Sequence, residues 1–289
     1  MKGIILAGGK GSRLYPMTRA ASKPLLPIYD KPMIYYPLSI LMMAGIKDIM
    51  IITSPMDPEA YVRVLGDGTQ WGVHISYAVQ HVARGIADAF LIAEDFIGGD
   101  RCCLLLGDNL FHGGNLERIV RNAAESNSGA TVFGYPVNNP RAFGVVEFDR
   151  NYNVLSIEEK PKKPKSHYAV PGLYFYDEKA VELAKTLKPS ARGELEITSL
   201  NQEYLIRGEL KVTLMEKNTF WLDTGTPTGM LEAAQYVRKV QEDQGAYVAN
   251  LEELAWEKGF IDDAQLARLS EEMKMTEYGQ YLIRLLERK

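Results

Sequence analysis

The distribution of apolar and polar residues along the first part of the chain predicts strands and helices that alternate. Apolar runs of strand length occupy residues 4–7, 49–53, 73–79 and 101–106. Stretches with apolar residues at helical spacing occupy residues 30–45, 57–65, 87–96 and 115–125. Alternating strands and helices form parallel βαβ units, so we expect an α/β fold with a doubly wound, mainly parallel or mixed sheet.

The pattern changes in the second part of the chain. Closely spaced extended segments, separated by turns rich in Asn, Asp and Pro, are expected at residues 130–137, 144–148, 154–159 and 167–176. Their spacing is typical of antiparallel pairing, which would extend the parallel core into a mixed sheet with an added β region.

The end of the chain is predicted to be helical. Thr226 and Pro227 have the residue types of an N-cap and a first helical position, which predicts a helix that continues to Glu242. Beyond Gly245 we expect two or three short helices that pack on the body or on a neighbouring subunit. The predicted organisation is a main domain over residues 1–244, with halves 1–137 and 138–244, and a helical tail over residues 245–289.

A glycine-rich loop follows the first predicted strand. Gly8, Gly9 and Gly11 allow the backbone N–H groups to approach a phosphate closely, and Arg13 adds a permanent positive charge. The loop lacks the Lys-Ser/Thr pair after its last glycine that a Walker loop needs, and Leu14 stands where a dinucleotide fingerprint has glycine. An ordinary strand-to-helix turn stays open as an alternative.

Two aspartates follow extended segments far apart in the sequence. Asp108 comes after the strand at residues 101–106, and Asp223 ends the short run at residues 220–223. Each could be a turn former only. Together, carboxylates from separate strands could bind a Mg²⁺ ion that bridges phosphates.

Composition and charge limit the possible partners. The chain has 289 residues, 46% of them hydrophobic, and a formal net charge of −4, which argues against a nucleic-acid partner. Phosphate groups would therefore have to be bound locally, by Lys10, Arg13, Lys23 or Lys160. No apolar segment has membrane-spanning length and no signal-peptide pattern occurs, so we expect no membrane partner and a cytoplasmic location. The adjacent Cys102 and Cys103 are expected to be reduced residues of a buried strand.

The segment Gly8-Gly9-Lys10-Gly11-Ser12-Arg13-Leu14, followed by Ser22-Lys23-Pro24-Leu25-Leu26-Pro27, resembles the signature of sugar-1-phosphate nucleotidyltransferases. The order of motifs over residues 1–262 is more similar to the thymidylyl branch than to the uridylyl or mannosyl branches. The resemblance implies a Rossmann-like core and Mg²⁺-dependent condensation of dTTP with glucose 1-phosphate to dTDP-glucose and pyrophosphate. It also implies a deoxysugar pathway of the dTDP-rhamnose type, a homotetramer, and feedback by a dTDP-rhamnose-like product.

The resemblance further implies roles for individual residues. Those implied to act in catalysis are Arg13, Lys23 and Lys160. Those implied to bind the nucleotide are Leu6, Gly8, Gly9, Gly11, Ser12, Arg13, Lys23, Gln80, Gly85 and Asp108. Those implied to bind the sugar are Asn109, Gly144, Glu159, Lys160, Val170, Tyr174 and Arg192. Those implied to bind the metal are Asp108 and Asp223.

The chain departs from the family pattern beside the expected base-binding glutamine. Asp88 occupies a position where relatives usually carry Gln, and Phe143 replaces a usual Tyr. The choice of nucleobase therefore stays open, with UTP or a broader nucleotide range as an alternative. A nucleotide-sugar sensor without turnover is a second alternative.

Overall fold

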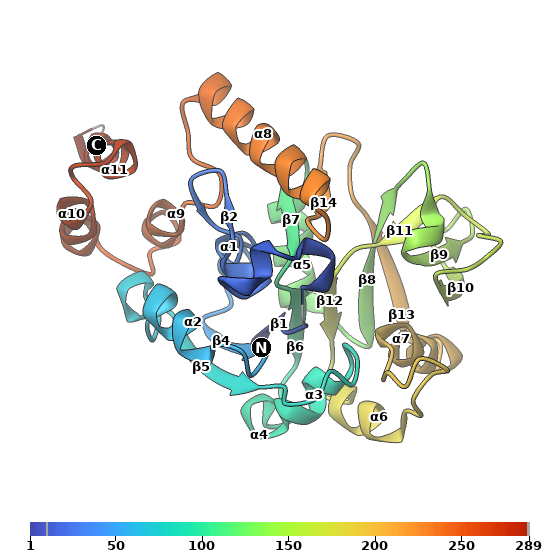
Figure 1. Ribbon diagram of the computed structural model, residues 1–289. Coiled ribbons are helices and arrows are strands. Elements are labelled where there is room, and N and C mark those ends of the chain that lie inside the picture. Colours follow the sequence, from blue (N-terminus) through green and yellow to red (C-terminus); the bar gives the residue numbers. More distant parts are fainter. Residues whose placement is uncertain (10, 288–289) are drawn as a thin grey trace.

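A mixed sheet of ten strands runs through the computed structural model, which describes residues 1–9 and 11–287 (Figure 1). Along the sheet the strands are β10 (Val154–Glu159), β9 (Gly144–Phe148), β11 (Tyr168–Val170), β8 (Ala130–Pro136), β12 (Leu173–Tyr176), β6 (Cys102–Leu106), β1 (Lys2–Ala7), β4 (Asp48–Thr53) and β5 (His74–Val79), and β13 (Leu210–Leu214) pairs with β8. Strands β6, β1, β4 and β5 are parallel to one another, whereas β12 joins β6 to β8 in antiparallel pairing. The expected α/β class with a mainly parallel or mixed sheet is confirmed.

The parallel strands are buried on both faces, which explains why they appear in the sequence as continuous apolar runs. Ile4 and Ile5 of β1 are both fully buried, and they belong to cores on opposite sides of the sheet. The two cysteines of β6 divide between the same two cores and are free thiols, as predicted.

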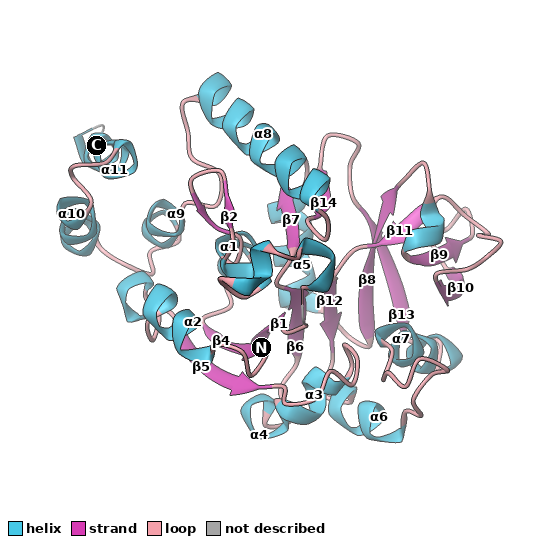
Figure 2. Cartoon of the chain, in the orientation of Figure 1, coloured by secondary structure: helices cyan, strands magenta, loops and turns pink. Residues whose placement is uncertain are grey.

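Helices cover both faces of the sheet (Figure 2). The core on one face is closed by α1 (Tyr35–Met43), α2 (Pro58–Leu65) and α5 (Leu116–Ser126). The core on the other face is closed by α3 (Asp88–Ile92), α6 (Ala180–Thr186) and α7 (Ile197–Ile206).

Some element boundaries differ from the predicted ones. The helix expected over residues 87–96 is divided at Ala93 into α3 and α4 (Glu94–Ile97). The helix expected from residue 30 begins only at Tyr35, because β2 (Pro27–Ile28) and β3 (Lys31–Pro32) form a small hairpin before it. The short strand β7 (Asn109–His112) and strand β13 were not predicted, and β7 pairs with β14 (Phe220–Asp223) in a separate sheet.

The C-terminal segment packs on the same core as α1. The predicted cap of α8 (Pro227–Gln244) is confirmed, since the Thr226 hydroxyl accepts a hydrogen bond from the Gly229 N–H at 3.1 Å. The described tail then forms α9 (Leu251–Glu257), α10 (Asp263–Glu272) and α11 (Glu277–Glu287). Trp256 and Phe260 are partly buried against the core, as their cost of exposure predicts. No helix within the described residues is long and apolar enough to cross a membrane.

Candidate active site

The carboxyl ends of three parallel strands open onto one cavity of about 240 Å³. The glycine loop follows β1, Gln80 follows β5, and Asp108 lies two residues after β6. Because β1 and β6 pair in parallel with Leu6 opposite Leu106, these ends lie at one edge of the sheet. The cavity is lined by Leu6, Gly8, Gly9, Lys23, Pro24, Gln80, Ala83, Gly85, Ile86, Leu106, Asp108 and Glu194.

The glycine loop has the backbone geometry that its composition predicts. Gly9 and Gly11 adopt positive φ angles of 91° and 58°, and the Gly11 carbonyl accepts a hydrogen bond from the Thr18 hydroxyl at 3.0 Å. A Cβ on Gly8 would lie 3.1 Å from Oε1 of Gln80, so a side chain there would crowd the cavity. Ser12 begins a short 3₁₀ helix and, like Gly11, does not line the cavity. Lys10, one of the candidate phosphate-binding residues, lies outside the described residues.

The pairing of β7 with β14 brings the two aspartates together. Asp223 stands opposite Asn109 in this pair, and the Thr224 hydroxyl donates a hydrogen bond to the Asp108 carbonyl at 2.8 Å. The Lys23 ammonium bonds to Oδ2 of Asp108 and lies 3.9 Å from Oδ1 of Asp223. Segments from three separate parts of the chain thus meet at one partly buried ion cluster.

The electrostatics of this cluster favour a bound cation. Burial raises the pKa of Asp223, the Asp108 charge raises it further, and the Lys23 and Arg13 charges oppose the increase. Oδ1 of Asp223 is buried without a hydrogen-bond partner among the described residues. An acidic pair with an unsatisfied oxygen fits a divalent metal ion. Since the described residues contain no cluster of three or more His, Cys, Asp or Glu that could hold a metal, further ligands would come from substrate phosphates or water.

Arg13 lies beside Asp223 rather than on the cavity wall. Its Nη2 atom is 2.6 Å from the position that a Cβ on Gly225 would occupy, and that position is 2.9 Å from Oδ1 of Asp223, so a side chain there would displace the guanidinium. Arg13, which is predicted to bind phosphate, therefore belongs to the same charged cluster as Lys23, next to the cavity.

A second cavity of about 130 Å³ adjoins the first and shares Ile86 and Leu106 with it. It contains predicted sugar-binding residues, namely Asn109, Gly144, Glu159, Lys160, Val170 and Tyr174, together with the predicted metal ligand Asp223. Lys160 has a φ of 43°, which is uncommon for a residue with a side chain and marks a constrained backbone at the end of β10. Its Nζ atom lies 3.6 Å from Oε1 of Glu159.

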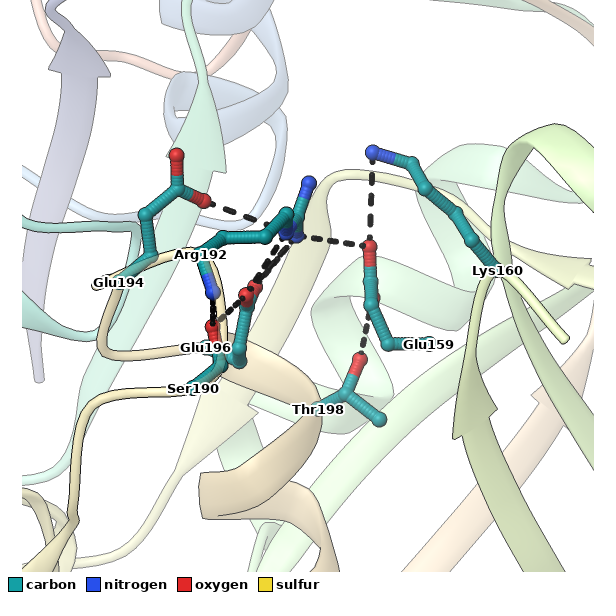
Figure 3. Close-up of polar contacts among 7 residues, drawn as sticks. All are labelled: Glu159, Lys160, Ser190, Arg192, Glu194, Glu196 and Thr198. Carbon is teal, nitrogen blue, oxygen red and sulfur yellow. Dashed lines mark hydrogen bonds and ion pairs between the residues drawn. The ribbon is translucent and has the colours of Figure 1, made fainter.

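Arg192 does not line this cavity, and Figure 3 shows its polar contacts. Its guanidinium pairs with Glu196 at 2.8 Å and lies 3.6 Å from both Glu159 and Glu194. Glu159 also accepts a hydrogen bond of 2.6 Å from the Thr198 hydroxyl. Arg192 is thus linked to the cavity through its ion pair with Glu159.

Several side chains at the site had no predicted role. Trp221 donates a hydrogen bond of 2.7 Å to Oδ1 of Asn109, and Asn109 in turn donates one of 3.0 Å to Oδ1 of Asp108. Glu194 and Thr198 line the cavities, and Asp88 contacts Gln80 beside them. Trp221 could have been noted from its place two residues before Asp223, but its partner depends on the pairing of β7 with β14.

His112 lies away from the ion cluster, on β7. Its Nδ1 atom is 2.9 Å from the Tyr236 hydroxyl, and burial lowers its pKa. These contacts give His112 a structural role in joining β7 to α8.

Comparison with known proteins gives consistent matches. Residues 2–240 match a family model described as nucleotidyl transferase. The chain is 57% identical over its full length to the full-length glucose-1-phosphate thymidylyltransferase of Neisseria meningitidis serogroup A. It is 54% identical, again with 100% of both chains covered, to the enzyme of the same name from Mycolicibacterium smegmatis.

Solved structures show the same architecture. A crystal structure of a proposed glucose-1-phosphate thymidylyltransferase from Bacillus anthracis, in complex with a sucrose, superimposes with a TM-score of 0.76 at 46% identity, covering 82% of this chain and 95% of that one. A UDP-glucose pyrophosphorylase complexed with UDP-glucose superimposes with a TM-score of 0.72 at 24% identity, covering 82% and 98%. The second similarity concerns the fold alone.

Proposed function

The chain belongs to the nucleotidyl transferase family, and we propose that it transfers the thymidylyl group of dTTP to glucose 1-phosphate. The products are dTDP-glucose and pyrophosphate. The observation that carries the proposal is the position of Lys23, whose ammonium joins Asp108 on the glycine-loop cavity to Asp223 on the adjoining cavity. A triphosphate in the first cavity and a sugar phosphate in the second would meet at this cluster.

The reaction is an in-line displacement at the α-phosphorus of dTTP. A phosphate oxygen of glucose 1-phosphate forms the new P–O bond as the bond to pyrophosphate breaks, and the leaving group carries away the electron pair. A phosphate monoester is mostly dianionic at neutral pH, so the attacking oxygen needs no general base. The protein has to position the two substrates and stabilise the charge that accumulates in the transition state.

The positive side chains have distinct places in this scheme. Lys23 neutralises charge at the α-phosphate, Arg13 neutralises the departing pyrophosphate, and Lys160 binds the attacking sugar phosphate. Glycine-loop N–H groups contact the triphosphate, and Glu159 accepts hydrogen bonds from sugar hydroxyls. Support for these roles comes from the shared cluster of Lys23, Arg13 and Asp223 and from the position of Lys160 on the second cavity.

Asp108 and Asp223 are the residues that would bind a divalent cation, which we take to be Mg²⁺. When bound, such a cation supplies charge neutralisation for the phosphate oxygens. The unpartnered, buried Oδ1 of Asp223 supports this assignment.

Other features come to the proposal from the resemblance. These are a place at the start of a deoxysugar pathway of the dTDP-rhamnose type, a homotetramer, feedback by a dTDP-rhamnose-like product, and a cytoplasmic location. A division into a main domain, residues 1–244, and a tail, residues 245–289, is likewise a proposal.

A pyrophosphate-release assay tests the function. The purified chain is incubated with glucose 1-phosphate, MgCl₂, and dTTP, UTP, CTP or GTP in parallel. We expect the highest kcat/KM with dTTP, and release that depends on both the sugar phosphate and the cation. Nucleotide binding without pyrophosphate release from any of the four would favour a sensor and refute the proposal, whereas a clear preference for UTP would place the chain among uridylyl enzymes.

A further inference from the structure

A buried carboxylate stands beside the nucleotide cavity and has no role in the reaction scheme above. Asp88 opens α3 and is only 1% exposed. Its Oδ2 atom accepts a hydrogen bond of 2.9 Å from Nε2 of Gln80, and its Oδ1 atom lies 2.8 Å from Nη2 of Arg84. A buried charge is costly unless it is paired, and the Arg84 guanidinium is within ion-pair distance of this carboxylate, although Oδ1 accepts no hydrogen bond from the described residues.

The hydrogen bonds of Gln80 give its amide a single orientation. Nε2 donates to Asp88 and also to the Gly85 carbonyl at 3.2 Å, so both of its hydrogens point to acceptors in the protein. Oε1 accepts no hydrogen bond from the described residues, and it points toward Gly8 in the wall of the cavity. Rotating the amide by half a turn would place Oε1 against two oxygens that can only accept.

The loop that carries these contacts is itself fixed. The Arg84 carbonyl accepts a hydrogen bond of 2.6 Å from the Leu195 N–H, and the Ala87 N–H donates one of 3.0 Å to the Leu195 carbonyl. Gly85 has a φ of 105°, and a Cβ on it would lie 2.4 Å from the Leu195 carbonyl oxygen. These contacts hold the Gly85 carbonyl, one of the two acceptors of Nε2, in its place beside Gln80.

We propose that Asp88 is a positioning residue that fixes the Gln80 amide with its oxygen toward the ligand, and thereby selects nucleobases with a ring N–H donor. Thymine and uracil carry such a donor at N3, whereas cytosine has a lone pair at the same atom. A fixed oxygen accepts a hydrogen bond from the first group and repels the second. This inference rests on the proposed function, because it assumes that the base of a nucleotide substrate lies against Gln80.

The substitution Asp88→Asn tests the inference. An Asn amide carries a donor as well as an acceptor, so position 88 no longer opposes the rotated Gln80 amide. The rotated amide then meets one acceptor, the Gly85 carbonyl, instead of two, and it offers cytosine a donor. We expect the ratio of kcat/KM for dCTP to that for dTTP to rise at least about tenfold. The change should appear in KM, with kcat for dTTP within about twofold of the original value, since the phosphates and their cluster are untouched.

Asp177→Asn is the matched control. Asp177 is also a buried aspartate, 5% exposed, and it accepts hydrogen bonds from Tyr204 and the Gly129 N–H far from the nucleotide cavity. We expect Asp177→Asn to leave the dCTP to dTTP ratio unchanged. Asp88→Ala is the second variant if Asp88→Asn does not fold; it removes this acceptor from Nε2 altogether and should raise the ratio in the same direction.

Calorimetric binding of dTTP and dCTP, measured without glucose 1-phosphate, separates this inference from the proposed function. Tighter binding of dTTP by the unaltered protein, together with loss of that preference in Asp88→Asn, supports the inference even if no pyrophosphate is released. Normal turnover of dTTP with an unchanged ratio in Asp88→Asn overturns the inference and leaves the function standing. An equal loss of affinity for both nucleotides also overturns it, because that result would give Asp88 a structural role only.

Discussion

Two buried lysines, eight positions apart in the sequence, illustrate how similar burial serves different purposes. Lys23 is 9% exposed and Lys31 is 5% exposed. Lys23 contacts two aspartates that belong to distant segments, and one of their oxygens, Oδ1 of Asp223, has no hydrogen-bond partner among the described residues. Lys31 contacts its neighbour Asp30 at 2.7 Å and lies within 6 Å of aromatic rings from the body and the tail.

The surroundings of the two lysines differ more than their burial does. The rings near Lys31 belong to Tyr36 of α1 and to Tyr247 and Tyr278 of the tail. The cavity beside Lys31 has a volume of about 470 Å³, larger than the 240 Å³ of the nucleotide cavity. Neither burial nor cavity size therefore identifies the reactive site, whereas convergent charges with an unsatisfied oxygen do.

Replacing Lys23 should have the largest effect. Lys23→Met keeps the length of the side chain but removes the charge between Asp108 and Asp223. We expect kcat to fall about 100-fold, which corresponds to about 2.7 kcal/mol of activation free energy. Steady-state pyrophosphate release at saturating substrates measures the loss. A kcat within threefold of the original value would show that the buried charge is structural in both places.

Removing the guanidinium next to that cluster should have a smaller effect. Arg13 opposes the raised pKa of Asp223 from a position beside it rather than between the aspartates. For Arg13→Ala we expect kcat to fall at least about tenfold, or about 1.4 kcal/mol. Arg19→Ala is the matched control, since Arg19 lies over the ring of Tyr15 at 5.1 Å and has no contact with the cluster. Equal losses in the two variants would argue against a specific role for Arg13.

The sequence predicted much of the cluster but not its connections. The strands β1 and β6 were recognisable because both of their faces are buried, and the glycine loop and Asp108 follow from where these strands end. Asp223 was singled out by its position after a short extended run together with the family resemblance. The pairing of β7 with β14 joins segments far apart in the chain, and no local pattern encodes such a register.

The same limit applies to side chains that act through others. Arg192 is predicted to bind the sugar, and its ion pairs with Glu196 and with Glu159, which lines the cavity, could not be read from the sequence. Asp88 was noted only as a departure from the family pattern, and its bond to Gln80 became visible with the fold of the loop. Residue type predicted that these groups are charged, whereas their partners depend on tertiary packing.

Trp221 tests how the cluster is held in place. In Trp221→Phe the hydrogen bond from the indole to Asn109 is lost, but Asn109 keeps the Gly172 N–H as a donor at 3.1 Å. We expect kcat to fall about fivefold, roughly 1 kcal/mol, because Asp108 is less well oriented. Trp71→Phe removes a comparable buried hydrogen bond, to Glu252 at 2.9 Å, and should leave kcat unchanged. If both variants lose activity equally, the orienting role of Trp221 is refuted.

Replacing Lys31 should have the smallest effect and completes the comparison. Burial lowers the pKa of Lys31 from its ordinary value of 10.5, although Asp30 opposes the decrease. The desolvation of the charged ammonium therefore outweighs its attraction to Asp30. Lys31→Met fills the same space without a charge. We expect kcat within about twofold of the original value, and a free energy of unfolding at pH 7 within about 1 kcal/mol. A loss of kcat comparable to that of Lys23→Met would contradict the distinction between the two lysines.

The pH dependence of stability gives the sharper test of Lys31. Because its pKa is lower in the folded protein than in the unfolded chain, the unfolded chain binds more protons between the lowered pKa and 10.5. The free energy of unfolding of the unaltered protein should therefore rise with pH, relative to that of Lys31→Met, as pH increases through this window. Denaturant titrations of both proteins at several pH values from 7 to about 10.5 measure this difference in the free energy of unfolding. Both proteins contain the same tyrosines, so the contribution of tyrosine titration cancels in the difference. A difference that is constant over this range would mean that Asp30 and the aromatic rings offset the burial of Lys31 completely, and its pKa would then not be lowered in the folded protein.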